Sequence, residues 1–263
     1  MLRIINTLLT NEKEGEDSFM KLNKNDVVLF SGDSITDGNR GKCMDCNHIM
    51  GHGYQYIVAS QLALENAENM PKFINKGYSG ERAEELLKKW QEDVIDNNPT
   101  VLSILVGAND GGHGYFAGIT PDETAQRYET NLRAILEKTR NELGGIKIIV
   151  CEPFYYPLDK SDYSYKFTPH PDGIEEPFKR PDSSDPEDSV VYREAANAKI
   201  RAASKKVAEE FGCIFVPLYD KIKENAERSR MEYFIWDGTH PSIAGHMIIA
   251  REWLKAVENA AQS

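Results

Sequence analysis

The sequence predicts an α/β fold in three layers, with helices covering both faces of a central, mostly parallel, five-stranded sheet. Two observations support this fold class. Short, nearly continuous apolar runs recur along the chain, and such runs suit strands that are buried on both faces of a parallel sheet. Longer stretches with apolar residues at helical spacing separate these runs. Strands that alternate with helices indicate βαβ units.

Each element has its own signal. The expected strands are Val27 to Phe30, Phe73 to Asn75, Val101 to Val106, Ile146 to Cys151 and Cys213 to Val216. Helical spacing places Ala83, Leu86, Leu87, Trp90 and Val94 on one face of a helix. Thr120, Pro121 and Glu123 form the start signal of another helix, which we expect to end before Gly144. Further helices are expected from about Val190 to Phe211 and from Pro241 onward.

The length and composition are typical of a folded domain. The chain has 263 residues, of which 40% are hydrophobic, so disorder of the whole chain is excluded. We expect an N-terminal extension over residues 1–25 and a single domain over residues 26–263. An irregular insertion is expected at residues 155–189, because six of the twelve prolines fall there.

The charge and the apolar segments limit the possible partners and location. With 31 Lys and Arg against 42 Asp and Glu, the net charge is 31 − 42 = −11, which disfavours nucleic acid and anionic membranes as partners. The apolar N-terminus is short, is broken by Asn6 and Thr7 and shows no cleavage site, so we expect no signal peptide. Four cysteines are too few for a disulfide framework. A cytoplasmic location is therefore expected, and a homo-oligomer remains open.

Candidate chemical groups follow the expected strands, where ligands bind in an open parallel sheet. Ser34 lies on the turn after the first strand, and Gly32 permits a tight backbone there. A serine at such a place is, by itself, more often a helix cap. Ser79-Gly80 follows the second strand, and Gly107-Ala108-Asn109-Asp110 follows the third. These groups are expected at one edge of the sheet.

A histidine and an aspartate lie close together near the C-terminus. His240 precedes Pro241, which keeps the histidine out of the helical region and on a loop. Asp237 lies three residues upstream. It is therefore close enough to accept a hydrogen bond from one ring nitrogen while the other nitrogen faces outward.

Together these segments resemble the SGNH hydrolases, or GDSL-type esterases. The four blocks of that family appear in order as Gly32 to Asp37, Ser79-Gly80, Gly107 to Asp110 and Asp237 to His240. The run from Trp236 to Leu254 resembles the bacterial branch that includes cytoplasmic acetylxylan esterases. The resemblance implies a flavodoxin-like SGNH hydrolase fold.

The resemblance also implies roles for individual residues. Ser34 would be the nucleophile, His240 the general base and then acid, and Asp237 the residue that orients the imidazole. The oxyanion would be held by the backbone N–H groups of Ser34 and Gly80 and by the Asn109 side chain. No cofactor and no metal are expected. We interpret Gly77, Asp110, Asp33 and Asp37 as structural.

The implied reaction is hydrolysis of short-chain acyl esters through an acyl-enzyme. Acetylated oligosaccharides, such as xylo-oligosaccharides, are the expected substrates. An arylesterase, a thioesterase or a lysophospholipase is the alternative within the same chemistry. A non-catalytic sugar-binding protein is the alternative from another class. Tyrosines could stack on sugar rings or anchor a loop, namely Tyr115, Tyr155, Tyr156, Tyr163 and Tyr165.

Other functional interpretations are weaker. Cys43, Cys46, His48 and His52 offer zinc-ligand types but lack the usual spacer between ligand pairs, so a reduced glycine-rich loop is the favoured interpretation. Residues 112–117 match a dinucleotide-binding fingerprint only loosely, since no strand ending in an acid follows at the required distance. The Gly-x-Ser-x-Gly elbow of α/β-hydrolases is absent from the sequence. For His113, His170 and His246 we expect surface or packing roles.

Overall fold

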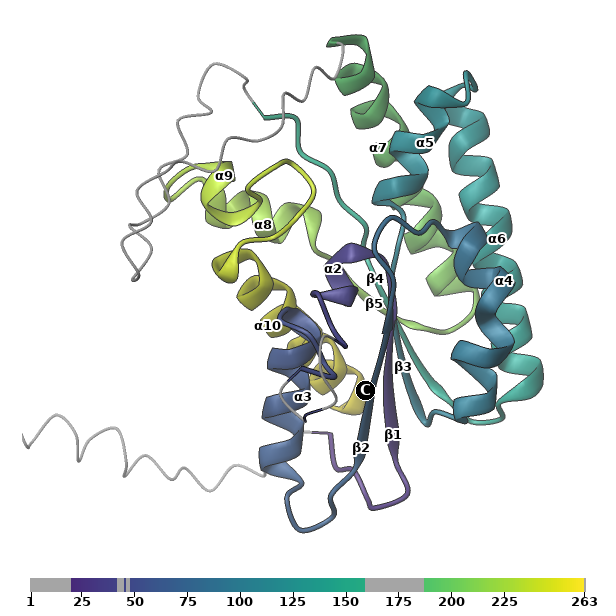
Figure 1. Ribbon diagram of the computed structural model, residues 1–263, viewed down its shortest axis with the longest axis vertical. Helices are drawn as coiled ribbons and strands as arrows, with labels where there is room; N and C mark the ends of the chain where they lie inside the picture. The colour runs from purple at the N-terminus through teal and green to yellow at the C-terminus, as the bar shows by residue number, and fades with distance from the viewer. Residues whose placement is uncertain (1–19, 42–44, 46–47, 159–186, 263) are drawn as a thin grey trace, which may run out of the picture.

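The computed structural model describes residues 20–41, 45, 48–158 and 187–262. Its centre is a five-stranded parallel sheet with the strand order β2-β1-β3-β4-β5 (Figure 1). The strands are β1 Val27–Gly32, β2 Lys72–Gly77, β3 Val101–Leu105, β4 Lys147–Cys151 and β5 Ile214–Val216. The expected sheet is confirmed, and all of its described pairings are parallel.

Helices cover both faces of the sheet (Figure 1). One face carries α3 Tyr54–Glu65, α8 Tyr219–Ala226, α9 Met231–Phe234 and α10 Ile243–Gln262, and the other carries α4 Ala83–Asp93, α5 Ala108–Phe116, α6 Pro121–Glu142 and α7 Glu187–Glu210. The short helix α2 Ser34–Asp37 follows β1, and the 3₁₀ helix η1 Ile95–Asn97 follows α4. The three-layer architecture is thus confirmed.

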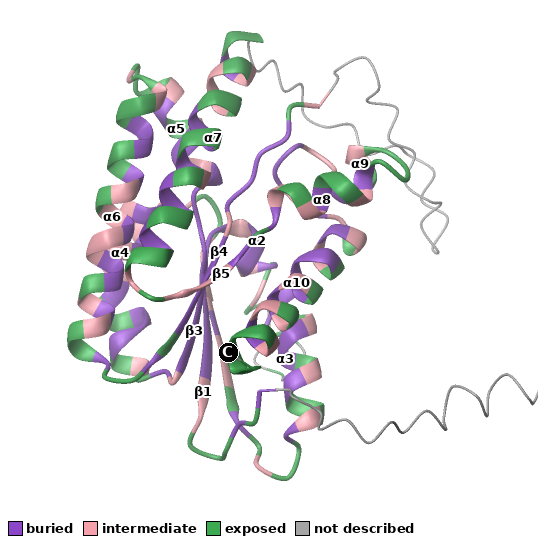
Figure 2. Cartoon of the chain, turned by 180° about the vertical axis from the view of Figure 1, so that it is seen from behind, coloured by how far each residue is buried: buried purple, intermediate pink, exposed green. Residues whose placement is uncertain are grey.

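The sheet is buried by two hydrophobic clusters, one on each face (Figure 2). Phe30 and Trp253 pack in the cluster beneath α3 and α10, while Leu29 and Trp90 pack in the cluster beneath α4, α6 and α7. Adjacent residues of a strand point to opposite faces, so the inner strands β1, β3 and β4 need apolar residues at most positions. This explains why the strands appear as continuous apolar runs in the sequence.

The central strands end at the same level. Gly32 pairs with Gly77 of β2 and with Leu105 of β3 in the sheet register. The loops that follow these three strands therefore leave the sheet side by side. This alignment brings the segments after Gly32, Gly77 and Leu105 to one edge.

Helix signals in the sequence are largely confirmed. In α6 the Thr120 hydroxyl accepts a hydrogen bond from the Glu123 N–H at 3.2 Å, and the Glu123 carboxylate accepts one from the Thr120 N–H at 2.8 Å. In α4 the residues Ala83, Leu86 and Trp90 are buried as expected. Within the described residues, no helix is long and apolar enough to cross a membrane.

Two expected boundaries need correction. Met20 and Leu22 are buried in the core, and the Leu22 N–H donates to Asn66 Oδ1 at 2.8 Å. The packed domain therefore includes Met20 and Leu22, which fall within the expected N-terminal extension of residues 1–25. At the expected insertion, Tyr155 and Tyr156 are buried and α7 begins at Glu187, while residues 159–186 lie outside the described part of the chain.

Candidate active site

Ser34 stands at the first position of α2, directly beyond the end of the central strand β1. The turn needs a glycine at position 32, because a Cβ there would lie 2.2 Å from the Leu105 carbonyl oxygen and 2.4 Å from Thr36 Oγ1. Asp33 then caps the helix by accepting a hydrogen bond from the Ile35 N–H at 3.0 Å. The local sequence thus fixes the position of Ser34 on the sheet edge.

Asp33 is fully buried beside Ser34. Burial raises its pKa to about 6, although the hydrogen bond from Ile35 and the nearby His240 favour the charged form. Its carboxylate accepts the hydrogen bond from the Ile35 N–H within the turn. The structural role that we expected for Asp33 therefore agrees with its contacts.

His240 lies next to Ser34 although the two are 206 positions apart in sequence. The His240 Nε2 and Ser34 Oγ atoms are 2.8 Å apart. On the other side of the ring, His240 Nδ1 lies 2.6 Å from Asp237 Oδ2. Ser34, His240 and Asp237 thus form one continuous chain of short polar contacts.

The Asp237 carboxylate is held by its own loop. Its Oδ1 accepts hydrogen bonds from the N–H groups of Thr239 at 2.9 Å and His240 at 2.6 Å. Burial opposes its ionisation, but the hydrogen bond from His240 and the charge of that residue together keep the pKa of Asp237 below its usual value. Asp237 is therefore an anion at neutral pH.

The loop that carries His240 differs from the expectation in one respect. The last helix begins at Ile243, not at Pro241. Pro241 instead forms an antiparallel bridge with Ile235, and the Ser242 hydroxyl accepts a hydrogen bond from the Gly245 N–H at 3.3 Å, so Ser242 caps the helix. The bridge holds residues 235–241 in a narrow turn.

Gly80 and Asn109 occupy the loops after β2 and β3. Gly80 has a φ of +85°, a conformation that favours glycine. Asn109 lies in the first turn of α5, and its Nδ2 donates to the Glu81 carbonyl oxygen at 2.9 Å. Gly80 and Asn109 both line a hollow of about 330 Å³. Its other lining residues are Arg82, Ala108, Gly112, His113, Phe116, Ser189 and Arg193.

The chain matches the GDSL-like lipase/acylhydrolase family over residues 30–248. It belongs to this family. The match covers the residues of all four blocks, from Gly32 to His240.

Several relatives of this GDSL-like protein cover nearly its whole length. An acetylxylan esterase from Geobacillus stearothermophilus is 30% identical over 242 residues, which are 90% of this chain and 96% of the relative. A solved structure of that enzyme has a TM-score of 0.67 at 28% identity, covering 90% of this chain and 96% of the other. A GDSL-like lipase from Parabacteroides merdae has a TM-score of 0.72 at 31% identity, covering 90% of this chain and 98% of the other.

A lipoprotein from Bacillus subtilis is 32% identical over 134 residues, which are 49% of each chain. With the family match and the near-full-length relatives, the sequence and the fold identify this chain as a carboxylic ester hydrolase of the GDSL family.

Arg193 lines the hollow of the GDSL-like enzyme and also contacts the loop that carries His240. Its Nη2 donates to Thr239 Oγ1 at 3.2 Å, and its guanidinium carbon lies 4.2 Å from the centroid of the Tyr155 ring. The sequence predicted no role for Arg193 or Arg82, and it predicted a surface or packing role for His113. Arg82 comes two residues after Gly80, and His113 comes four residues, or one helical turn, after Asn109. That spacing could have indicated a shared surface.

The tyrosines that we singled out have different environments. Tyr156 is buried, stacks on Tyr219 with ring centroids 4.8 Å apart, and donates to the Tyr219 carbonyl oxygen at 2.6 Å. Tyr115 donates to Asp188 at 3.3 Å. Tyr156 is therefore a packing residue. Tyr163 and Tyr165 lie outside the described residues.

The cysteine and histidine segment is described only in part. Cys43 and Cys46 lie outside the described residues. His48 Nδ1 lies 2.8 Å from Asp45 Oδ2 on the surface. No group of three or more potential metal ligands occurs in the part of the chain that the structure describes.

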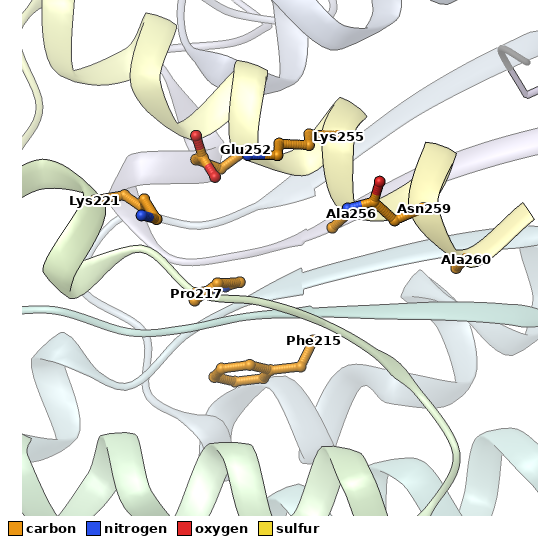
Figure 3. Close-up of a pocket in the computed structure, with 8 residues that line it drawn as sticks. All are labelled: Phe215, Pro217, Lys221, Glu252, Lys255, Ala256, Asn259 and Ala260. Carbon is orange, nitrogen blue, oxygen red and sulfur yellow. The ribbon is translucent and has the colours of Figure 1, made fainter. Parts of the chain in front are cut away.

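A second hollow, of about 450 Å³, lies between β5, α8 and α10 (Figure 3). Phe215 and Pro217 line one side of it, and Lys221, Glu252 and Lys255 approach from the two helices. None of its lining residues contacts Ser34 or His240 in the hydrogen bonds described above.

Proposed function

We propose that the protein is a serine esterase that hydrolyses short-chain acyl esters through an acyl-enzyme, with acetylated oligosaccharides as its substrates. The observation that carries this proposal is the chain of contacts from Ser34 Oγ to His240 Nε2 at 2.8 Å and from His240 Nδ1 to Asp237 at 2.6 Å. A serine hydroxyl is a poor nucleophile unless a positioned base takes its proton. This arrangement supplies that base.

In the first half of the reaction, Ser34 Oγ attacks the ester carbonyl carbon while His240 Nε2 takes the hydroxyl proton. The Asp237 carboxylate stabilises the imidazolium that forms. When the tetrahedral intermediate collapses, the bond to the alcohol breaks and His240 gives its proton to the leaving oxygen. The acyl group remains on Ser34.

In the second half, water attacks the acyl-enzyme and His240 takes a proton from it. Collapse of the second tetrahedral intermediate breaks the bond to Ser34 Oγ, which regains the proton from His240. The products are a carboxylic acid and the free enzyme. No cofactor enters either step.

The negative charge of both intermediates needs hydrogen-bond donors. We assign this role to the backbone N–H groups of Ser34 and Gly80 and to the Asn109 carboxamide. A carboxamide has two N–H groups, and the bond to the Glu81 carbonyl uses one of them. That bond fixes the plane of the amide, so the second N–H has a defined direction at the wall of the hollow.

Variants of a solved relative support the triad assignment. Catalytic variants of the Geobacillus acetylxylan esterase replace a serine, an aspartate and a histidine. The aspartate and histidine of that enzyme are three positions apart, as Asp237 and His240 are here.

The hollow beside Asn109 supports a sugar as the alcohol part of the substrate. Arg82, His113, Ser189 and Arg193 give its wall many hydrogen-bond donors, which suit the oxygens of a carbohydrate better than a long acyl chain. The Phe116 ring also lines it and is 74% exposed. An open aromatic face suits the apolar face of a pyranose.

An arylesterase, a thioesterase or a lysophospholipase would use the same triad on other acyl esters. The polar lining and the modest volume of about 330 Å³ speak against a long-chain lipid. A sugar-binding protein without catalysis is the alternative from another class. The short contacts between Ser34, His240 and Asp237 favour catalysis over this alternative.

We further propose a cytoplasmic location, because the run from Trp236 to Leu254 resembles the bacterial branch that includes cytoplasmic acetylxylan esterases. The net charge of −11 supports small molecules rather than nucleic acid or anionic membranes as partners.

Labelling with a serine-directed sulfonyl fluoride tests the proposed nucleophile. Mass spectrometry is expected to map the adduct to Ser34, and Ser34→Ala is expected to lose both labelling and ester hydrolysis. Ser60→Ala is the matched control, because Ser60 is an exposed serine on α3 whose hydroxyl donates to the Tyr56 carbonyl. An unlabelled Ser34, or a Ser34→Ala variant with normal activity, would contradict the mechanism.

A substrate series tests the proposed substrate class. Acetyl, butyryl and octanoyl esters are compared with acetylated xylo-oligosaccharides by kcat/KM. We expect a decline with acyl length and the highest value for the acetylated sugars. Activity that rises with chain length would contradict the deacetylase proposal while leaving the esterase mechanism intact.

A further inference from the structure

Lys89 lies on α4 and contacts the segment that carries Gly80 at two points. Its Nζ lies 3.8 Å from the centroid of the Tyr78 ring and forms an ion pair with the Glu81 carboxylate. Tyr78 and Glu81 flank Ser79 and Gly80 in sequence. One lysine side chain thus spans the turn that presents the Gly80 N–H group.

Gly80 depends on its neighbours for its orientation. A Cβ built at this position would have no heavy atom within 4 Å among the described residues, apart from its adjacent residues. Its φ of +85° is also a region that glycine enters and leaves at little cost. The direction of the Gly80 N–H is therefore set by the contacts of Tyr78 and Glu81.

Glu81 connects both donors of the oxyanion site. Its carboxylate pairs with Lys89, its carbonyl oxygen accepts the hydrogen bond from Asn109 Nδ2 at 2.9 Å, and its N–H donates to the Tyr78 carbonyl at 3.3 Å. The Glu81 side chain is 17% exposed, so its pair with Lys89 is partly shielded from water. A displaced Glu81 would move the Gly80 peptide and the Asn109 carboxamide together.

Tyr78 provides the fixed end of this arrangement. Its hydroxyl donates to Asp93 Oδ1 at 2.8 Å, and Lys76 Nζ donates to the same oxygen at 3.0 Å. The Tyr78 N–H donates to the Gly32 carbonyl at 2.9 Å, and the Arg40 guanidinium carbon lies 4.7 Å from the ring centroid. Tyr78 is thus anchored to β1 and α4 independently of Lys89.

We propose that Lys89 is a positioning residue of the oxyanion site, which holds Glu81 against the anchored Tyr78 and so orients the Gly80 N–H and the Asn109 carboxamide. This inference rests on the proposed esterase mechanism. Lys89 does not line the hollow, so it acts through Glu81 and not by touching the substrate.

A surface ion pair without functional consequence is the competing explanation. Exposed pairs contribute little to stability, and the Lys89 side chain is 39% exposed. Lys88 offers a matched control on the same helix. It is 62% exposed and pairs with Glu84 at 2.6 Å, and Glu84 lies outside the segment from Tyr78 to Glu81.

The first test compares Lys89→Met, Lys89→Arg and Lys88→Met in the hydrolysis of 4-nitrophenyl acetate. We expect Lys89→Met to lower kcat by about threefold to tenfold with KM within about twofold of the wild type, because the lost contacts act on the transition state. Lys89→Arg keeps a cation for Tyr78 and Glu81 and is expected to restore most of kcat. Lys88→Met is expected to match the wild type. Equal kcat values for Lys89→Met and Lys88→Met, or a loss in KM alone, would overturn the proposal.

The second test combines Lys89→Met with Asn109→Ala. Because Lys89 acts in part on the Asn109 carboxamide, its replacement is expected to cost less in the Asn109→Ala background than in the wild type. An equal fold-decrease in kcat in both backgrounds would overturn the proposal that Lys89 acts on the Asn109 carboxamide through Glu81.

Hydrogen exchange of the backbone amides in residues 79–82 provides a readout that does not depend on turnover. Lys89→Met is expected to exchange faster there than the wild type and Lys88→Met. If the wild type hydrolyses no ester, the proposed function fails, and the exchange rates still decide whether Lys89 holds this segment. Unchanged exchange in Lys89→Met would overturn the positioning role.

Discussion

The ionised state of Asp237 determines which nitrogen of His240 carries the proton. The Asp237 carboxylate accepts a hydrogen bond from the protonated Nδ1 of His240, and the two atoms are 2.6 Å apart. Nε2 is then unprotonated and accepts the hydrogen bond from the Ser34 hydroxyl. The spacing of Asp237 and His240 in the sequence predicted the first of these contacts. The contact with Ser34 could be expected only from the order of the family blocks, since the two groups are 206 positions apart.

Asn109→Ala tests the oxyanion assignment. Removal of one such donor typically lowers kcat by about a hundredfold to a thousandfold, and we expect a loss in that range with little change in KM. Steady-state kinetics on 4-nitrophenyl acetate measure it. Asn131→Ala is the control, because Asn131 also donates through Nδ2 to a backbone carbonyl, at 3.0 Å, on the exposed surface of α6. A loss of less than about tenfold in Asn109→Ala would contradict the assignment.

The proximity of Arg193 to Arg82 at the hollow could not be found in the same way. Arg193 comes from α7 and Arg82 precedes α4, so the two are 111 positions apart in sequence. Their proximity depends on how the helices pack on the sheet. A single sequence carries no periodic signal for such a contact, and only the fold reveals it.

At the scale of single elements, the strands were predicted well because a parallel sheet needs apolar residues on both faces. Helix α6 was predicted because its start has a complete capping box. Helix α5 was not predicted, because Gly111, Gly112 and Gly114 disfavour a helix in isolation. In the fold, a Cβ at Gly111 would lie 2.2 Å from Asn197 Nδ2, and one at Gly114 would lie 2.1 Å from Thr124 Oγ1. Two of these glycines thus serve the close packing of α5 on α6 and α7.

The turn between β1 and α2 makes a strong prediction about Gly32. We expect Gly32→Ala to destabilise the protein by about 1–3 kcal/mol or more, because its Cβ would lie 2.2 Å from the Leu105 carbonyl oxygen of β3. Urea unfolding measures this change. Gly144→Ala is the matched control, since a Cβ there would meet no heavy atom within 4 Å among the described residues. A Gly32→Ala variant as stable as Gly144→Ala would show that the turn tolerates a side chain.

At the scale of the whole molecule, buried carboxyl groups make the stability depend on pH. Burial raises the pKa of Asp110 to about 7, although the hydrogen bond from the Ala83 N–H and the Arg82 charge favour the anion. Between about pH 4 and pH 7 the folded state therefore holds a proton that the unfolded state has released. This group lowers the free energy of unfolding as the pH rises through that interval.

Asp110→Asn tests this dependence. Its side chain keeps an acceptor for the Ala83 N–H, which donates to Asp110 Oδ2 at 3.3 Å, but it cannot ionise. We expect the variant to be more stable than the wild type at pH 8, by on the order of 2 kcal/mol, and equally stable at pH 4. Urea unfolding at both pH values measures it. Asp122→Asn is the control, because Asp122 is 79% exposed. A stability difference that is the same at both pH values would contradict the raised pKa.

The separation of Ser34 from His240 also has a consequence for biosynthesis. In the proposed mechanism, a growing polypeptide that has emerged only through β4 already contains the nucleophile and the Gly80 and Asn109 donors, but it lacks the base. In that mechanism, we expect ester cleavage only after α10 has docked and the turn of residues 235–241 has closed against Ser34. Turnover of a chromogenic ester would thus report, during translation in vitro, the moment at which the last helix of a newly made molecule reaches its place.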